Sequence, residues 1–174
     1  VQSVFVADLD GDGDMDIVSC SALDDAISWY ENDGAADPSW TAADIATSAD
    51  GATSVFAADM DMDGDMDIVS CSALDDAISW YENDGAADPS WTAADIATSA
   101  DGATSVFAAD MDMDGDMDIL SASENDDKIA WYQNSAGRNA PLVTSVTSTK
   151  GNGSYGVGTN ISIIVNFSDQ VLVT

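Results

Sequence analysis

Basic side chains are almost missing from this sequence, and their absence limits its partners. Among 174 residues only Lys128, Arg138 and Lys150 are basic, against 33 acidic residues, so the formal net charge is −30. A surface of this charge repels nucleic acids and anionic membranes, and we expect neither as a partner. Histidine is absent altogether, which removes the most common general base and a frequent zinc ligand.

Long apolar runs are missing as well. No stretch of about 18 apolar residues occurs, so we predict no segment inserted in a membrane. The chain begins at Val1 without a methionine and ends at Thr174 within an apolar stretch. We therefore interpret it as a fragment of a longer polypeptide, in which the lack of a visible signal peptide says little about destination.

The acidic residues are nearly all aspartate, because Glu31, Glu82 and Glu124 are the only glutamates. Aspartate is short, favours turns and offers hard oxygen ligands, so this bias favours loops that bind cations. A salt-adapted or merely acidic surface would explain the excess of aspartate but not its placement at regular intervals.

An internal repeat indicates the fold. Residues 12–68 recur unchanged at 63–119, with a period of 51 residues. Four β-prone runs of the second copy lie at 54–58, 67–72, 78–81 and 92–98. Four short strands per repeat, separated by turns rich in Gly, Asp, Asn and Pro, are typical of a β-propeller blade. No run has the spacing of an amphipathic helix.

The copies are too few to close a ring, because propellers have four to eight blades and residues 1–138 hold about three. We expect the remaining blades to come from a longer chain; in a second interpretation, other copies of the chain supply them. Cys20 and Cys71 occupy the same position in two successive blades. We expect both to be small buried side chains rather than a disulfide.

The character of the sequence changes after Arg138. Residues 139–142 are predicted to be a linker, and the acidic density drops in 143–174. Apolar residues at 161, 163, 165 and 167 alternate as in a half-buried strand. The predicted fold class is therefore all-β. It comprises a partial β-propeller of about three four-stranded blades over 1–138, followed by the first strands of a truncated β-sandwich.

Three nine-residue loops carry the chemistry. They span residues 8–16, 59–67 and 110–118, with Asp at loop positions 1, 3, 5, 7 and 9 and Gly at position 6. The fifteen candidate metal ligands are Asp8, Asp10, Asp12, Asp14, Asp16, Asp59, Asp61, Asp63, Asp65, Asp67, Asp110, Asp112, Asp114, Asp116 and Asp118. Ca²⁺ takes six to eight oxygens, and Gly allows the reversal that wraps the chain around the ion. We predict up to three Ca²⁺ ions, one per loop, with the position-7 residues ligating through the main chain.

Other ions, and loops without an ion, are the alternatives. An EF-hand loop needs a glutamate at position 12, where this chain has Ser19, Ser70 and Ser121. A cage of several carboxylates suits Ca²⁺ better than Mg²⁺, and zinc would need His or paired Cys ligands. Solvated acidic turns would explain a single loop of this kind, but three loops at one period favour calcium.

The loop pattern, preceded by a Val-Phe-x-Ala strand and followed by an aliphatic residue, resembles the FG-GAP/VCBS repeats of integrin-α-like β-propellers. The resemblance covers about residues 1–138. It implies structural calcium in the loop between neighbouring strands, with side-chain ligands at Asp8, Asp10, Asp12 and Asp16 and at their copies. Met62 and Met113 replace Gly11 in the later copies, which we expect to stiffen the loop while binding is retained. The tail at 141–174 resembles bacterial Ig-like or cadherin-like modules, so we expect an Ig-like sandwich there.

The resemblance implies a calcium-binding extracellular adhesion or recognition module, secreted or at the cell surface. Its partner would be an extracellular protein or glycan. We predict no enzyme, because no Ser or Cys has a plausible base partner. The Asp pairs at 24–25, 75–76 and 126–127 are expected to be solvated turn residues.

The alternatives are a lectin-type propeller that binds glycans, or a non-catalytic propeller appended to a secreted enzyme. Trp29, Trp80 and Trp131 recur with the repeat, which favours packing between blades. Tryptophans exposed between blades would favour the lectin. Spacer repeats of the thrombospondin type 3 kind are disfavoured, because about 42 residues of strand-like sequence separate successive loops.

Overall fold

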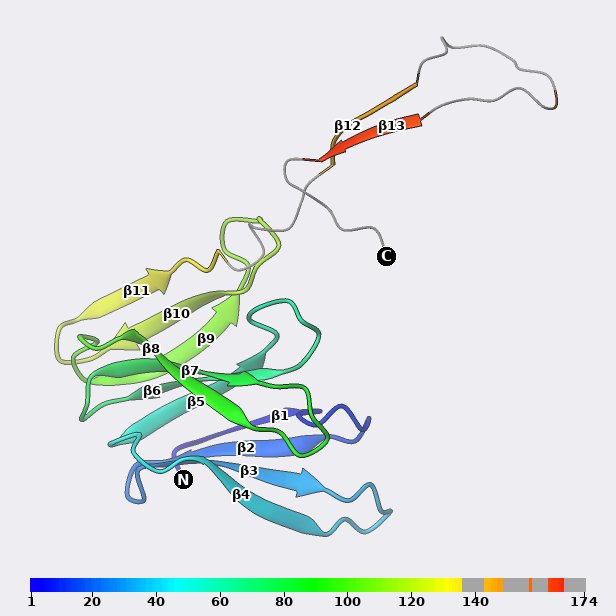
Figure 1. Ribbon diagram of the computed structural model, residues 1–174. Coiled ribbons are helices and arrows are strands. Elements are labelled where there is room, and N and C mark those ends of the chain that lie inside the picture. Colours follow the sequence, from blue (N-terminus) through cyan, green and yellow to red (C-terminus); the bar gives the residue numbers. More distant parts are fainter. Residues whose placement is uncertain (136–142, 149–156, 158–162, 168–174) are drawn as a thin grey trace. The chain divides into compact units, whose positions relative to one another are not determined.

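The structure, a computed structural model, describes residues 1–135, 143–148, 157 and 163–167. The chain divides into two compact units, Val1–Ala136 and Gly137–Thr174. Strands are the only regular elements among the described residues (Figure 1). That part of the chain therefore holds no helix long and apolar enough to cross a membrane. The all-β prediction is confirmed.

The first unit consists of three antiparallel sheets in which each strand pairs with its neighbour in sequence. The first sheet contains β1 (Ser3–Ala7), β2 (Asp16–Ser21), β3 (Ala26–Asn32) and β4 (Trp40–Ala46). The second contains β5 (Ala52–Ala58), β6 (Asp67–Ser72), β7 (Ala77–Asn83) and β8 (Trp91–Ala97). The third contains β9 (Ala103–Ala109), β10 (Asp118–Ser123) and β11 (Lys128–Tyr132). The four strands predicted for the second copy are confirmed.

The strand register repeats together with the sequence. Phe5 pairs with Val18 in the first sheet, and Phe56 pairs with Val69 in the second. β-branched and aromatic side chains fit a pleated surface that is covered on both faces. The Asp-rich loops therefore begin and end at equivalent places in all three sheets.

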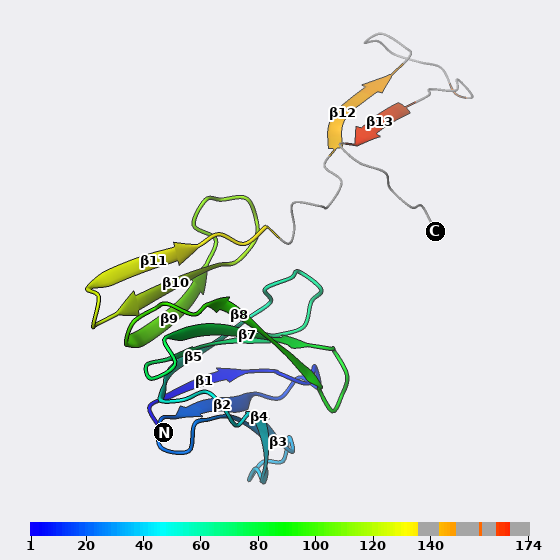
Figure 2. The ribbon, with the colours of Figure 1, turned by 60° about the vertical axis from the view of Figure 1, so that its left-hand side comes forward.

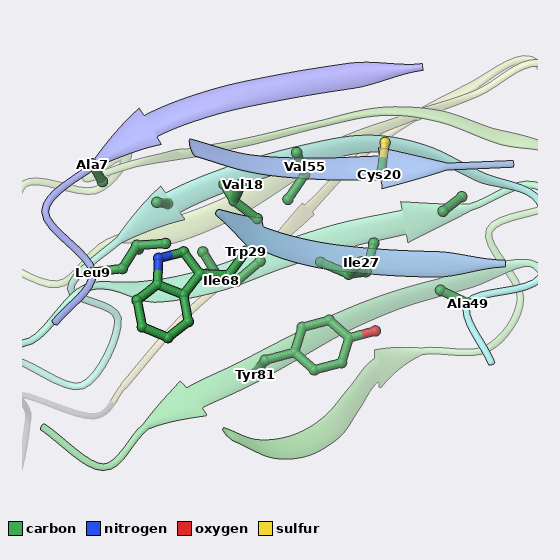
Figure 3. Close-up of a cluster of buried hydrophobic side chains, with 12 residues drawn as sticks. Ala7, Leu9, Val18, Cys20, Ile27, Trp29, Ala49, Val55, Ile68 and Tyr81 are labelled. Atoms are coloured by element: carbon green, nitrogen blue, oxygen red, sulfur yellow. The ribbon is translucent and has the colours of Figure 1, made fainter. Parts of the chain in front are cut away.

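Successive sheets lie face to face (Figure 2). Clusters of buried apolar side chains fill the space between them. In the first cluster Val18, Ile27 and Trp29 lie against Val55 and Tyr81 of the second sheet (Figure 3). A second cluster joins the other face of the second sheet to the third sheet.

The aromatic rings of Phe5, Phe56 and Phe107 form a row across the three sheets, with centroids 4.5 Å and 4.6 Å apart. Cys20 and Cys71 are buried free thiols, as predicted. Each blade-like sheet is therefore stabilised mainly by its neighbours.

The expected ring and sandwich are not seen in the described part of the chain. It holds three blade-like sheets, the third with three strands, and no closed propeller. In the second unit β12 (Val143–Ser148) pairs with β13 (Ile163–Phe167) as a two-stranded antiparallel ribbon. The Ig-like sandwich stays a prediction, and the linker predicted at 139–142 lies outside the described residues.

Candidate metal centre

Each Asp-rich loop connects the first two strands of its sheet. Loop position 1 follows the first strand directly, and position 9 is the first residue of the second strand. The carboxylate oxygens of positions 1, 3 and 9 converge in every copy, and one oxygen from each lies within 4.8 Å of the others. The three triads are Asp8, Asp10 and Asp16; Asp59, Asp61 and Asp67; and Asp110, Asp112 and Asp118.

The ninth residue of each loop is a buried carboxylate that fixes the loop to the sheet. Asp16 is 1% exposed, and its two oxygens accept hydrogen bonds from the backbone amides of Leu9, at 3.0 Å, and Asn32, at 2.9 Å. Asp67 accepts from Met60 and Asn83 in the same way, at 3.0 Å and 2.8 Å. These bonds hold the start of the loop and the end of the third strand around one carboxylate.

In the first two loops the first residue leaves one carboxylate oxygen without a partner, whereas both oxygens of Asp110 in the third loop accept hydrogen bonds. Oδ2 of Asp8 accepts a hydrogen bond from the amide of Gly13 at 3.0 Å, whereas Oδ1 is buried and has no hydrogen-bond partner. Asp59 repeats this arrangement, with Oδ2 3.2 Å from the amide of Gly64 and Oδ1 unpartnered. A buried carboxylate oxygen without a partner is costly, and a cation within the triad would satisfy it.

Loop positions 5 and 7 do not belong to the triads. Asp12 is exposed, and its Oδ1 accepts a hydrogen bond from the amide of Asp14 at 2.8 Å. The Asp14 carboxylate lies against Gly34 in the connection between β3 and β4, and Asp65 lies against Gly85. The structure thus brings together nine of the fifteen predicted residues. It leaves Asp12, Asp14, Asp63, Asp65, Asp114 and Asp116 outside the triads.

The loop backbone makes left-handed turns at two positions. Gly13, Gly64 and Gly115 have φ of 96°, 103° and 100°, which agrees with the reversal predicted at position 6. Position 4 is also left-handed: Met62 has φ of 66° and Met113 has φ of 61°. A side chain rarely adopts this conformation, so the substitution of Gly11 introduces strain as well as stiffness.

Burial raises the pKa of three carboxyls of the triads, those of Asp10, Asp61 and Asp67. Burial raises the pKa of Asp10, and the nearby charges of Asp16, Asp12 and Asp8 raise it further. Burial raises the pKa of Asp67 to about 6, although the amides of Asn83 and Met60 act in the opposite direction. The protein without an ion therefore holds these carboxylates in the charged form at a cost that a bound cation would relieve.

Two residue positions near the triads were missed from the sequence. Asn83 sits at the end of β7, and its counterparts are Asn32 and Asn134; all three hold the ninth loop residue through their backbone amides. The charge of Glu82 raises the pKa of Asp61, after the larger effects of burial and of Asp63. The signal that could have identified the asparagines is their recurrence with a period of 51 residues. The third copy keeps the asparagine although the residues around it change.

The Asp pairs lie in the predicted turns, but their second member is not simply solvated. Asp25 has φ of 52°, and its Oδ1 accepts a hydrogen bond from the amide of Gly51 at 3.1 Å. Asp76, with φ of 54°, accepts from Gly102 at 3.0 Å. Each of these residues therefore holds the segment that leads to the next sheet.

The tryptophans favour packing between sheets. Trp29 is buried in the first cluster, and Trp80 packs against the second. Trp80 also lines a cavity of about 150 Å³ together with Met60, Ile119 and Tyr132. Trp131 is half exposed on the third sheet.

Comparison with known families identifies the repeat. A family model described as an FG-GAP-like repeat matches residues 8–70 and 63–121, which together cover well over half of the chain. The first match contains two complete acidic loops, at 8–16 and 59–67, and the second contains the loop at 110–118; each match ends within the strand that follows its last complete loop. A search of curated proteins found no match.

Proposed function

Because the chain belongs to the FG-GAP-like repeat family, we propose that its acidic loops bind calcium ions that clamp the first two strands of each sheet. The observation that carries the proposal is the convergence of three carboxylates in every loop, with a buried, unpartnered oxygen on Asp8 and Asp59. Asp8, Asp10 and Asp16 would hold the ion in the first loop, and their copies would hold it in the others. A bound ion would neutralise the triad and fix the loop that joins two strands.

The donor set favours calcium over other ions. The ligands are carboxylate oxygens, which suit hard cations, and no thiolate or imidazole lies in a triad. Ca²⁺ accepts irregular shells of six to eight oxygens, whereas Mg²⁺ demands near-octahedral geometry and retains its waters. A loop that supplies three converging carboxylates fits the larger ion.

The family and the acidic charge support a proposal about the wider role. We propose a secreted or cell-surface module for adhesion or recognition, because calcium reaches millimolar concentrations outside cells and weak structural sites are filled there. Its partner would be an extracellular protein or glycan. We assign no catalysis to the acidic groups, because they recur once per repeat and serve the loops and turns. The burial of Trp29 disfavours the lectin alternative, whereas Trp80, which lines the cavity beside Met60 and Tyr132, keeps it as a second candidate.

Calcium titration of the full chain tests the proposal. Calorimetry should give three ions per chain, and millimolar Ca²⁺ should raise the melting temperature relative to EGTA, while Mg²⁺ should not. The double variant Asp10→Asn/Asp61→Asn should bind one ion.

The matched control is Asp37→Asn/Asp88→Asn, which removes the same charge at exposed positions outside the loops and should bind three. A full chain whose melting temperature and heat of titration do not respond to Ca²⁺ would overturn the proposal.

A further inference from the structure

The side chain of Asn83 connects two acidic loops that lie in different sheets. Its Nδ2 donates hydrogen bonds to the carbonyl of Leu9, at 2.8 Å, and to the carbonyl of Met66, at 3.1 Å. Leu9 lies between the triad residues Asp8 and Asp10 of the first loop, and Met66 precedes Asp67 of the second. One amide group therefore holds the peptide backbone of two candidate metal sites.

Asn83 is buried, and both its backbone amide and its side-chain oxygen are hydrogen-bonded. The residue is 2% exposed, its backbone amide donates to Oδ1 of Asp67 at 2.8 Å, and its own Oδ1 accepts from Gly85 at 3.0 Å. Leu9 is held as firmly, because its amide donates to Asp16 and its side chain is buried in the cluster between the first two sheets. A movement of either loop is thus transmitted to the other through buried groups.

An asparagine side chain also connects the second and third loops, whereas Asn32 of the first sheet makes no such connection among the described residues. Nδ2 of Asn134 donates to the carbonyl of Met60 in the second loop and to that of Met117 in the third, at 3.1 Å for the latter. Asn32 donates to Met15 of its own loop at 3.0 Å, and among residues 1–135 no loop precedes it. In the described part of the chain, no further asparagine covers the third loop. Asp110 and Asp112 of this loop are exposed, whereas their counterparts in the first two loops are half-buried.

We propose that Asn83 and Asn134 couple the metal sites of adjoining sheets, so that calcium binds the three loops cooperatively. The inference rests on the proposed calcium binding. An ion held by Asp8 and Asp10 fixes the Leu9 peptide between them, and this carbonyl then orients Asn83 and, through it, the peptide that carries Asp67. The second loop consequently loses less conformational freedom when its own ion binds.

A double-mutant cycle on the full chain tests the coupling. Asp10→Asn disables the first loop, and we expect it to weaken calcium binding at the second loop by about fivefold or more. In a chain that also carries Asn83→Ala, Asp10→Asn should leave the affinity of the second loop unchanged. Asn32→Ala is the matched control, because it removes the equivalent side chain without breaking a connection between loops; with it the fivefold effect should persist.

A second readout separates coupling from simple destabilisation. A purely structural role of Asn83 would lower the melting temperature equally in EGTA and in Ca²⁺, whereas coupling requires Asn83→Ala to reduce the increment that Ca²⁺ produces. If Asn83→Ala does not fold, Asn134→Ala with Asp61→Asn tests the same point between the second and third loops.

Calcium binding to independent sites, with the same second-loop affinity whether or not the first loop is intact, would overturn the coupling and leave the proposed function standing. An absence of calcium binding in the unsubstituted chain would overturn both.

Discussion

Asp67 is subject to opposing influences in the protein without an ion. It is 1% exposed, so desolvation disfavours its charge, while two backbone amides favour the charge by donating to it. Burial prevails and raises the pKa to about 6. A carboxyl in this condition binds either a proton or a cation, and the concentration of each decides which one is bound.

The titration of Asp67 should therefore depend on calcium. Its folded pKa lies above the ordinary value of 3.8. Its contribution to stability is thus full below pH about 4 and is lost as the pH rises through about 6. In EGTA, carbon-detected NMR should place the midpoint near 6, and Ca²⁺ should lower it because the ion favours the charged form.

Asp84 is the control, because hydrogen bonds from the amides of Ser90 and Ala86 lower its pKa and it lies outside the loops. Its midpoint should not respond to Ca²⁺. An Asp67 midpoint that calcium leaves unchanged would contradict the assignment of this carboxyl to a metal site.

Gly34 should tolerate a methyl group less well than Gly11. Both are left-handed, with φ of 67° and 74°, so an alanine at either position costs about 1–2 kcal/mol in backbone strain. At Gly34 the added methyl would also overlap the carboxylate of Asp14, whereas nothing lies within 4 Å of it at Gly11. We expect Gly34→Ala to lower the free energy of unfolding by at least about 1 kcal/mol more than Gly11→Ala. Urea denaturation in EGTA measures the difference, and equal effects would mean that Asp14 moves aside freely.

Strand β5 carries the middle ring of the aromatic row. Phe56 meets Phe5 on one side and Phe107 on the other, while Phe107 meets only Phe56 among the described residues and is 52% exposed. Each such ring pair contributes about 0.5–1.5 kcal/mol beyond the area it buries. We expect Phe56→Leu to destabilise the chain by about 1–3 kcal/mol and Phe107→Leu by about half as much, measured by chemical denaturation. Equal losses would show that the row contributes only hydrophobic area.

The strands could be predicted because their signals are local. The runs at 54–58 and 67–72 match β5 and β6 closely, since β-prone residues there are bounded on both sides by Asp and Gly turns. The positions of the acidic loops could be predicted as well, because five aspartates and one glycine recur at a fixed spacing.

The contacts that hold each loop in place could not be predicted, because they join residues that are distant in sequence. Asp14 turns away toward Gly34, twenty residues later, and Asn83 reaches Leu9, 74 residues earlier. A repeat shows that Asn32, Asn83 and Asn134 are equivalent, but it does not show which loop each one contacts. That information comes from how the sheets pack.

Each of the two outer sheets exposes one face to solvent. The equivalent faces within the stack of three sheets are buried. Val4 and Val6 on β1 are 59% and 53% exposed, whereas Val55, the counterpart of Val4 on β5, is 3% exposed against the first sheet. Ile129 and Trp131 on β11 are 85% and 50% exposed, whereas their counterparts Ile27 and Trp29 are 0% and 4% exposed. Each exposed end is thus one half of an interface that the chain already forms between its own sheets.

In the 174-residue chain studied by itself, without blades from a longer polypeptide, we expect a second copy to cover these faces head to tail, because the interface between the first two sheets joins the same two kinds of surface. The net charge of −30 opposes contact between copies, so association should appear as salt screens the charge and as protein concentration rises. Sedimentation equilibrium of the full chain at low and high salt measures it. Ile129→Asp should weaken the association, whereas Ala87→Asp, which adds the same charge at a position that is exposed even in the middle sheet, should not. A chain that stays monomeric at high salt, or that responds equally to the two substitutions, would show that these faces do not recognise each other.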